Sequence, residues 1–329
     1  MAALKITPLW LILTITLSLL SIGLILWFLP LPLSDLNLFD LEGSQSLRVI
    51  FFLRLPRVLI ALATGATLAS SGAAVQGVFQ NDLASPELLG ITGGASVGAL
   101  IAFQWSRFGE YYLWVPLAAL IGGLLTSLLV TSLNSKSRSI SPSRDLIIKG
   151  LAISGILSSI VALLLFLSKE QEVRQYLFWM MGSLENRRWE HFLLALPLQI
   201  FVLFWLFFHR KELDYFALGY WGARGVGFPW ESRRKMFLIM AALGTSASVA
   251  ATGALGFIGL LVPHAARLWV GPQSKVLIPT SMVLGSALLV LADQSSQVLF
   301  YPSSFPVGLL LSLVGGVLFF LLAGRSKNV

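Results

Sequence analysis

The chain has 329 residues, contains no cysteine and carries little charge, since Asp, Glu, Lys and Arg together make up 12% of it. Without cysteine it can hold neither a disulfide framework nor a thiolate metal site, and it has no thiol nucleophile. Its three histidines and 15 carboxylates follow no metal-ligand or acid–base spacing, so no metal, no cofactor and no enzyme activity is predicted. The phosphate-loop pattern G-x-x-x-x-G-K-[ST] is also missing, so any ATP would be bound by another polypeptide.

Apolar residues, by contrast, make up 56% of the chain, and its mean hydropathy is +0.83. Soluble domains are rarely so apolar, so the composition predicts an all-α, polytopic membrane protein. A bilayer core needs about 20 apolar residues per helix, and ten segments qualify, of which the third and eighth are short. These segments are 9–28, 58–79, 88–103, 113–133, 146–167, 192–208, 236–251, 255–270, 276–292 and 305–322.

The basic residues lie between the apolar segments and form no continuous face, which argues against nucleic-acid binding in spite of a net charge of +8. If the N-terminus is cytoplasmic, most Lys and Arg residues fall on the cytoplasmic side, so the positive-inside rule predicts that both termini are cytoplasmic. The first segment is expected to be retained as a span, because no small-residue cleavage site follows it. We expect a single transmembrane domain over residues 1–329.

Two connections are too long to be simple turns. Residues 209–235 mix basic, aromatic and glycine residues, which fits either a cytoplasmic docking surface or an interfacial loop whose aromatic side chains lie at the headgroup level. Residues 168–190 contain an amphipathic run, which would rest on the outer membrane face or cover the mouth of a cavity.

Residues 54–98 combine an apolar helix of membrane-spanning length with many glycines and alanines. Small residues such as Gly65 and Gly72 let helix backbones approach closely, as in the packed interior of a transporter. The pattern Ala-Ser-Ser-Gly-Ala at 69–73 is similar to Ala-Ala-Thr-Gly-Ala at 250–254, five spans later. This similarity predicts an inverted repeat, in which spans 2–5 match spans 7–10.

Several motifs follow one another in a fixed order. They are RLPR at 54–57, the glycine-rich helix with Gln76, NDLASPELLGITGG at 81–94, VRQYLFWMMGS at 173–183, ALG at 217–219 with ARGVG at 223–227, GALGFIGLLVPHAAR at 253–267, and Asp293 followed by PVG at 306–308. Together these motifs resemble the FecCD-type permease family, which imports iron-siderophores, haem and cobalamin through ATP-binding-cassette transporters. The resemblance runs from about residue 50 to residue 325.

This resemblance implies a permease subunit in the bacterial cytoplasmic membrane. Its expected partners are two cytoplasmic ATPase subunits, a periplasmic or lipid-anchored substrate-binding protein, and a second permease chain in a homodimer or heterodimer. The implied cargo is a metal chelate; ferric siderophore is the commonest in the family, and haem, cobalamin and oxyanions such as molybdate are alternatives. The rival interpretation is an ion-coupled secondary transporter, which would show ionisable residues along several spans, whereas only Asp293 qualifies.

The family also implies roles for residues at the two ends of span 2. Arg54 and Arg57, at its outer mouth, would meet carboxylates of the binding protein, because a guanidinium holds a carboxylate bidentately; headgroup anchoring is the alternative. At the cytoplasmic end, Asn81, Asp82 and Leu83 match an Asn-Pro-Leu gate, and Ser143 would form its other half. Asp82 replaces the family's proline, and either adds negative charge to the gate or caps the next short helix.

In the same alignment, residues 209–235 match coupling helices that sit in a cleft of the ATPase. The residues expected to make contact there are Leu218, Gly219, Ala223, Arg224 and Gly227. The cytoplasmic end of span 8 would be fixed by Pro263, His264 and Arg267, in a structural rather than a metal-binding role. Gly65, Gly72 and Gln76 would line or pack the pathway.

Asp293 is expected to need partners, because a charge inside the bilayer is costly. Hydrogen bonds to Ser295 or Ser296 and to a neighbouring span are one interpretation, and direct contact with substrate is the other. Further departures from the family pattern are Tyr220 in place of an acidic residue, and Gln297 and Ser304-Phe305 in the outer docking surface. The departures at Asp82, Gln297 and Phe305 predict that the subunit works beside a non-identical permease.

Overall fold

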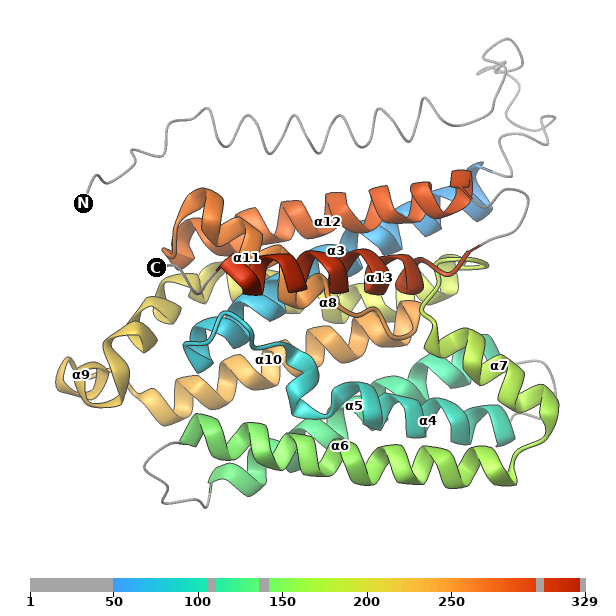
Figure 1. Cartoon of the computed structure of the whole chain (residues 1–329), viewed down its shortest axis with the longest axis horizontal. Helices are drawn as coiled ribbons and strands as arrows, with labels where there is room; N and C mark the ends of the chain where they lie inside the picture. The colour runs from blue at the N-terminus through green and yellow to red at the C-terminus, as the bar shows by residue number, and fades with distance from the viewer. Residues whose placement is uncertain (1–49, 106–110, 136–141, 300–304, 326–329) are drawn as a thin grey trace, which may run out of the picture.

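The computed structural model describes residues 50–105, 111–135, 142–299 and 305–325. These residues form helices and connecting turns, with no β-strand among them, so the predicted all-helical class is confirmed for the described part of the chain. The long helices lie side by side in one bundle (Figure 1). In chain order the elements are η2 (Ile50–Arg54), α3 (Leu55–Phe79), η3 (Pro86–Leu89), α4 (Ile91–Trp105), α5 (Tyr111–Ser135), α6 (Pro142–Leu167), α7 (Glu170–Met180), α8 (Trp189–His209), η4 (Arg210–Leu218), α9 (Gly219–Gly225), α10 (Trp230–Thr252), α11 (Ile258–Val270), α12 (Ser274–Leu299) and α13 (Val307–Arg325).

Every predicted span that lies within the described ranges falls on one of these helices, but the third and eighth were predicted to begin at 88 and 255, three residues before α4 and α11. Six helical runs are long and apolar enough to cross a membrane, and α4, α11 and the apolar part of α13 are shorter. The first predicted span, at 9–28, lies outside the described residues. The structure is that of a multi-pass membrane protein, and the count of ten spans stays a prediction.

Helix α3 is the centre of the bundle. In its most apolar window 78% of the residues are buried, against 6% in α6, and α3 packs against α8, α10, α11 and α12. Pro56 lies in its first turn, where a missing amide N–H costs no helical hydrogen bond. The helix ends at Gln80, which adopts a left-handed conformation with φ of 51°.

Glycines on α3 allow close backbone contact with two neighbouring helices. A Cβ at Gly65 would lie 2.2 Å from the carbonyl oxygen of Gly285 on α12, and one at Gly72 would lie 1.8 Å from that of Gly259 on α11. The Gly259 carbonyl has no intrahelical partner, because the residue four positions on is Pro263, which lacks an N–H. The close packing expected of the glycine-rich helix is therefore present in the structure.

The bundle has two ends, which we name by the short helices that mark them. The α7 end holds α7 and the start of α3, and the α9 end holds η4 and α9 (Figure 1). Within 209–235 the chain forms two short helices, η4 and α9, and within 168–190 it forms α7. Helix α6 lies at the side of the bundle with most of its surface uncovered.

Candidate functional site

At the α7 end, a buried carboxylate joins α12 to α3. Asp293 accepts hydrogen bonds from Nε and Nη2 of Arg57 at 2.8 and 2.7 Å, and from Nε2 of Gln297 at 3.0 Å. The Asp293 side chain is 4% exposed and that of Arg57 is 20% exposed. The carboxylate does not use the expected serines: Ser295 donates to the carbonyl of Leu291, and Ser296 to the backbone of Asp293. Its main partner is instead the arginine that the sequence assigned to docking.

Arg54 ends the short η2 helix one turn before Arg57 and is partly exposed. Trp189, at the start of α8, donates to the carbonyl of Phe51 at 2.9 Å and so holds η2 against the bundle. Both arginines are partly exposed, and Arg57 is held bidentately by the buried Asp293 carboxylate. Two parallel charge-assisted hydrogen bonds fix the orientation of the Arg57 guanidinium.

At the α9 end, the segment after α3 is tied to α11 by an ion pair between Asp82 and Arg267. Asn81 accepts a hydrogen bond from the backbone of Leu83 at 2.9 Å, which stabilises the turn. Leu83 is exposed. No side chain caps η3, so Asp82 does not act as the helix cap that the sequence allowed. Ser143 lies in the first turn of α6.

Exposed apolar side chains gather on η4, α9 and the turn that follows. We call this group the α9 patch, and its members are Tyr215, Leu218, Trp221 and Val226. Gly219 and Gly227 border it with φ of 72° and 80°, a backbone conformation that favours glycine. Ala223, by contrast, is fully buried beneath the patch.

A polar network borders the α9 patch. Arg224 donates to the Tyr220 hydroxyl at 2.8 Å, and this hydroxyl donates to Glu231 at 2.7 Å. The guanidinium of Arg224 also lies 4.0 Å from the Glu231 carboxylate. Tyr220, which departs from the family's acidic residue, therefore connects the arginine to an acidic side chain at the start of α10.

The remaining predicted residues lie along the contact of α3 with α11. Gln76 donates to the Leu260 carbonyl at 3.0 Å. Pro263 is buried, and His264 lies one position further along α11 with its Nδ1 buried and without a hydrogen-bond partner among the described residues. In the described part of the chain, no three His, Asp or Glu side chains come together as a metal site.

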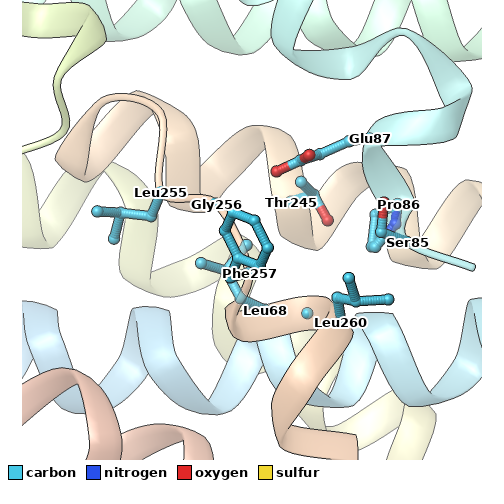
Figure 2. A pocket seen from close by; sticks show the side chains of 10 residues that line it. Leu68, Ser85, Pro86, Glu87, Thr245, Leu255, Gly256, Phe257 and Leu260 are labelled. Carbon is cyan, nitrogen blue, oxygen red and sulfur yellow. The ribbon is translucent and has the colours of Figure 1, made fainter. Parts of the chain in front are cut away.

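One site escaped the sequence analysis. A cavity of about 110 Å³ lies between η3, α3, α10 and the start of α11, and its lining includes Glu87, Thr245 and Phe257. Figure 2 shows Glu87 extending from η3 over this space, with Thr245 and the ring of Phe257 at its border. In the sequence Glu87 stands just before the third predicted span, so hydropathy gave no reason to place it beside a cavity; its side chain is exposed. The glycine and proline residues around it were the available signal for an irregular segment.

A multi-helix membrane bundle with close glycine contacts, an exposed apolar patch at one end and a cavity between interrupted helices is typical of membrane transport proteins. The FecCD transport family matches this chain over residues 11–325. The chain therefore belongs to that family, and the resemblance inferred from the motifs is confirmed.

Relatives match over nearly the whole chain. The Fe(3+) dicitrate transport system permease protein FecD of Escherichia coli is 34% identical, with 96% of this chain and 99% of the relative covered. The hemin transport system permease protein HmuU of Yersinia pestis is 34% identical over 91% of this chain and 90% of its own. The cobalamin import system permease protein BtuC of Halobacterium salinarum is 33% identical over 85% and 74%.

A solved structure has the same fold. It is a metal-chelate type ABC transporter in an inward-facing conformation, which aligns with a TM-score of 0.81 at 28% identity and covers 95% of this chain and 97% of that chain. The chain is thus a multi-pass permease-family protein whose relatives serve haem, hydroxamate, citrate-iron and cobalamin import systems.

Proposed function

We propose that this chain is the permease subunit of an ATP-binding-cassette importer that carries a metal chelate into the cytoplasm, with ferric siderophore as the cargo. The observation that carries the proposal is the match to permease relatives over nearly the full length of both chains. Two of those relatives serve iron-chelate systems, Fe(3+) dicitrate and iron(3+)-hydroxamate. In this proposal ATP is hydrolysed by separate subunits, since the chain has no phosphate loop.

The α9 patch is the proposed contact with the ATPase. Trp221 is 79% exposed and Leu218 is 53% exposed, and exposed apolar side chains next to charged ones are typical of protein interfaces. The neighbouring Arg224, Gly219 and Gly227 would add a charged contact and a close backbone approach. In this proposal the α9 end lies in the cytoplasm, as the positive-inside rule predicts.

The α7 end is the proposed docking face for a substrate-binding protein. Arg54 is partly exposed there, and Arg57 stands one helical turn further along in its pair with Asp293. A carboxylate of the binding protein can therefore reach Arg54 directly, whereas it would have to compete with Asp293 for Arg57. We infer that Arg54 makes the main contact and that Arg57 positions the start of α3.

At the opposite end, Asn81, Asp82, Leu83 and Ser143 are the proposed cytoplasmic gate. The pair between Asp82 and Arg267 ties the gate segment to α11. Helices that pack through small residues can rock against one another as the pathway opens. We propose that this rocking takes place within an inverted repeat of spans 2–5 and 7–10, and that a second permease chain covers the open side of α6.

The proposed function is tested on the complex of this chain with its ATPase and its binding protein. The chain is purified with its neighbouring ATPase and binding protein, and ATP hydrolysis is measured with ferric siderophore, haem, cobalamin or molybdate on the binding protein. We expect stimulation by a loaded binding protein, with ferric siderophore the most effective cargo. If no ATPase co-purifies and no loaded binding protein stimulates hydrolysis, the importer assignment fails.

A further inference from the structure

The cavity that contains Glu87 lies where two helix interruptions meet. The first lies between α3 and α4 and includes η3; the second separates α10 from α11 at residues 253–257. Within the second, Phe257 has a φ of 67°, which is unfavourable for a residue with a bulky side chain. Residues held in such conformations cluster at functional sites. Two segments far apart in the sequence thus meet with irregular backbone around one space.

This meeting point is deep in the bundle rather than at either end. A Cβ at Gly90, next to η3, would lie 3.5 Å from Oγ of Ser154, and Ser154 stands at the middle of α6. Irregular backbone at membrane depth is tolerated where it lines a cavity, and in transporters such breaks hold substrates or coupling ions. An ionisable side chain at this depth is a candidate functional residue.

One buried polar group of the cavity has no protein partner within the described residues, whereas the Glu87 side chain is exposed. Thr245 is 3% exposed, and its hydroxyl has no hydrogen-bond partner within the described ranges. A buried hydroxyl of this kind costs free energy unless something binds it. Ser85 adds a second hydroxyl to the lining. Among the lining residues Glu87 is the only ionisable one, so the site carries a single negative charge when this carboxylate is ionised.

We propose that this cavity is a binding subsite for one monovalent cation, with Glu87 as the anionic ligand and Thr245 as a neutral oxygen ligand. A single positive charge balances the one carboxylate of the lining, whereas a divalent ion would keep a net positive charge beside it. Divalent ions of the calcium type also take six to eight oxygen ligands, commonly with several carboxylates. A volume of about 110 Å³ holds a small cation with a few waters, each of which occupies roughly 30 Å³.

Two sources supply this chemistry: a free alkali ion, or a protonated amine carried by the cargo. The second source rests on the proposed importer function, because it needs a cargo that passes the cavity. The first does not, since it concerns only ion binding to this chain. Both place a positive charge beside the same carboxylate.

The test is direct binding to the full-length chain in lipid nanodiscs, together with any ATPase that co-purifies. The probes are ²²Na⁺, ⁸⁶Rb⁺ and ¹⁴C-methylammonium, compared between the unmodified chain and the variants Glu87→Gln, Glu87→Asp and Thr245→Val. The matched control is Glu185→Gln, which removes an exposed carboxylate from the turn before α8. Monodisperse elution in size-exclusion chromatography shows that each variant is folded.

We expect saturable binding of at least one probe, weakened about tenfold or more by Glu87→Gln and several-fold by Thr245→Val. Glu87→Asp is expected to retain part of the binding, and Glu185→Gln all of it. Preference for an alkali ion identifies a free ion as the source, and preference for methylammonium identifies an amine of the cargo. Absence of saturable binding by all three probes, or binding that survives Glu87→Gln unchanged, overturns the proposal whatever the transport assay shows.

Discussion

At the scale of single residues, the buried Asp293 carboxylate holds Arg57 in a structural role. The carboxylate is buried and accepts three hydrogen bonds, two from Arg57 and one from Gln297. A buried carboxylate without its cation keeps the desolvation cost and loses the attraction that offsets it. Arg57 is therefore needed inside the protein, and it cannot turn outward without leaving Asp293 uncompensated.

We expect Arg57→Gln to lower the free energy of unfolding by about 3 kcal/mol, because it leaves a buried charge unpaired. Adding Asp293→Asn to this variant should recover part of the loss. The control is Arg174→Gln, which breaks an exposed pair with Glu170 and should cost about 1 kcal/mol or less. Denaturant titration in detergent measures all three, and equal losses for the two arginines would contradict the role of Asp293.

The pair between Asp82 and Arg267 gives a second prediction at this scale. Asp82→Arg should raise ATP hydrolysis without cargo several-fold, because like charges would push the segment after α3 away from α11. The exchange Asp82→Arg with Arg267→Asp should restore the coupled rate, since it rebuilds the attraction with opposite polarity. A double variant as uncoupled as the single one would show that this ion pair does not hold the gate segment.

At the scale of elements, the contact of α3 with α11 depends on a proline and a glycine together. Pro263 leaves the Gly259 carbonyl without an intrahelical donor, and the missing side chain of Gly72 gives that oxygen room. Helices in a membrane associate through close packing of small residues rather than through hydrophobic driving force. The same logic applies where Gly65 meets Gly285 on α12.

We expect Gly72→Ala to separate α3 from α11 and to lower the free energy of unfolding by about 1 to 3 kcal/mol. The added Cβ would overlap backbone atoms of Gly259, which can move only if the helix moves with them. The matched control is Gly155→Ala on α6, where a Cβ would meet nothing within 4 Å. Thermal unfolding in detergent, followed by size-exclusion chromatography, distinguishes the two. Similar melting temperatures for both variants would contradict the packing argument.

At the scale of the whole molecule, the two ends of the bundle have different surfaces. The α9 end exposes the α9 patch beside Arg224 and Glu231, and the α7 end exposes Phe51, Phe52 and Leu53 beside the partly exposed Arg54. The glycine-packed α3 and the cavity near Glu87 lie between them. In the proposed function one partner binds at each of these ends, and the cargo passes between them.

Trp221→Ala should reduce co-purification of the ATPase about tenfold, because an exposed tryptophan at the centre of a contact surface is a typical hot spot. It should leave the stability of the permease unchanged, since the side chain is 79% exposed. The control is Trp105→Ala at the end of α4, which is 83% exposed; helix α4 lies away from α9 (Figure 1). Equal ATPase yield from both variants would place the interface elsewhere.

Much of the fold could be predicted because runs of apolar residues and the helix-breaking glycines and prolines between them are local signals. The long helices within the described ranges fall on the predicted spans, and η4 and α9 lie within 209–235, the connection that the sequence showed to be too long for a simple turn. The partner of Asp293 could not be predicted in this way, since Arg57 is 236 positions away. The serines expected for it are neighbours in sequence, but their hydroxyls bond to backbone carbonyls within the same helix.

The sequence by itself determined the membrane class, the positions of the helices and the membership of the FecCD transport family. Composition, periodicity and ordered motifs are properties of the chain and need no neighbours to be recognised. Only the tertiary structure decided which charges meet: Asp293 with Arg57, and Asp82 with Arg267. It also decided that Glu87 lines a cavity with Thr245, because the packing of helices distant in sequence sets which polar groups face each other.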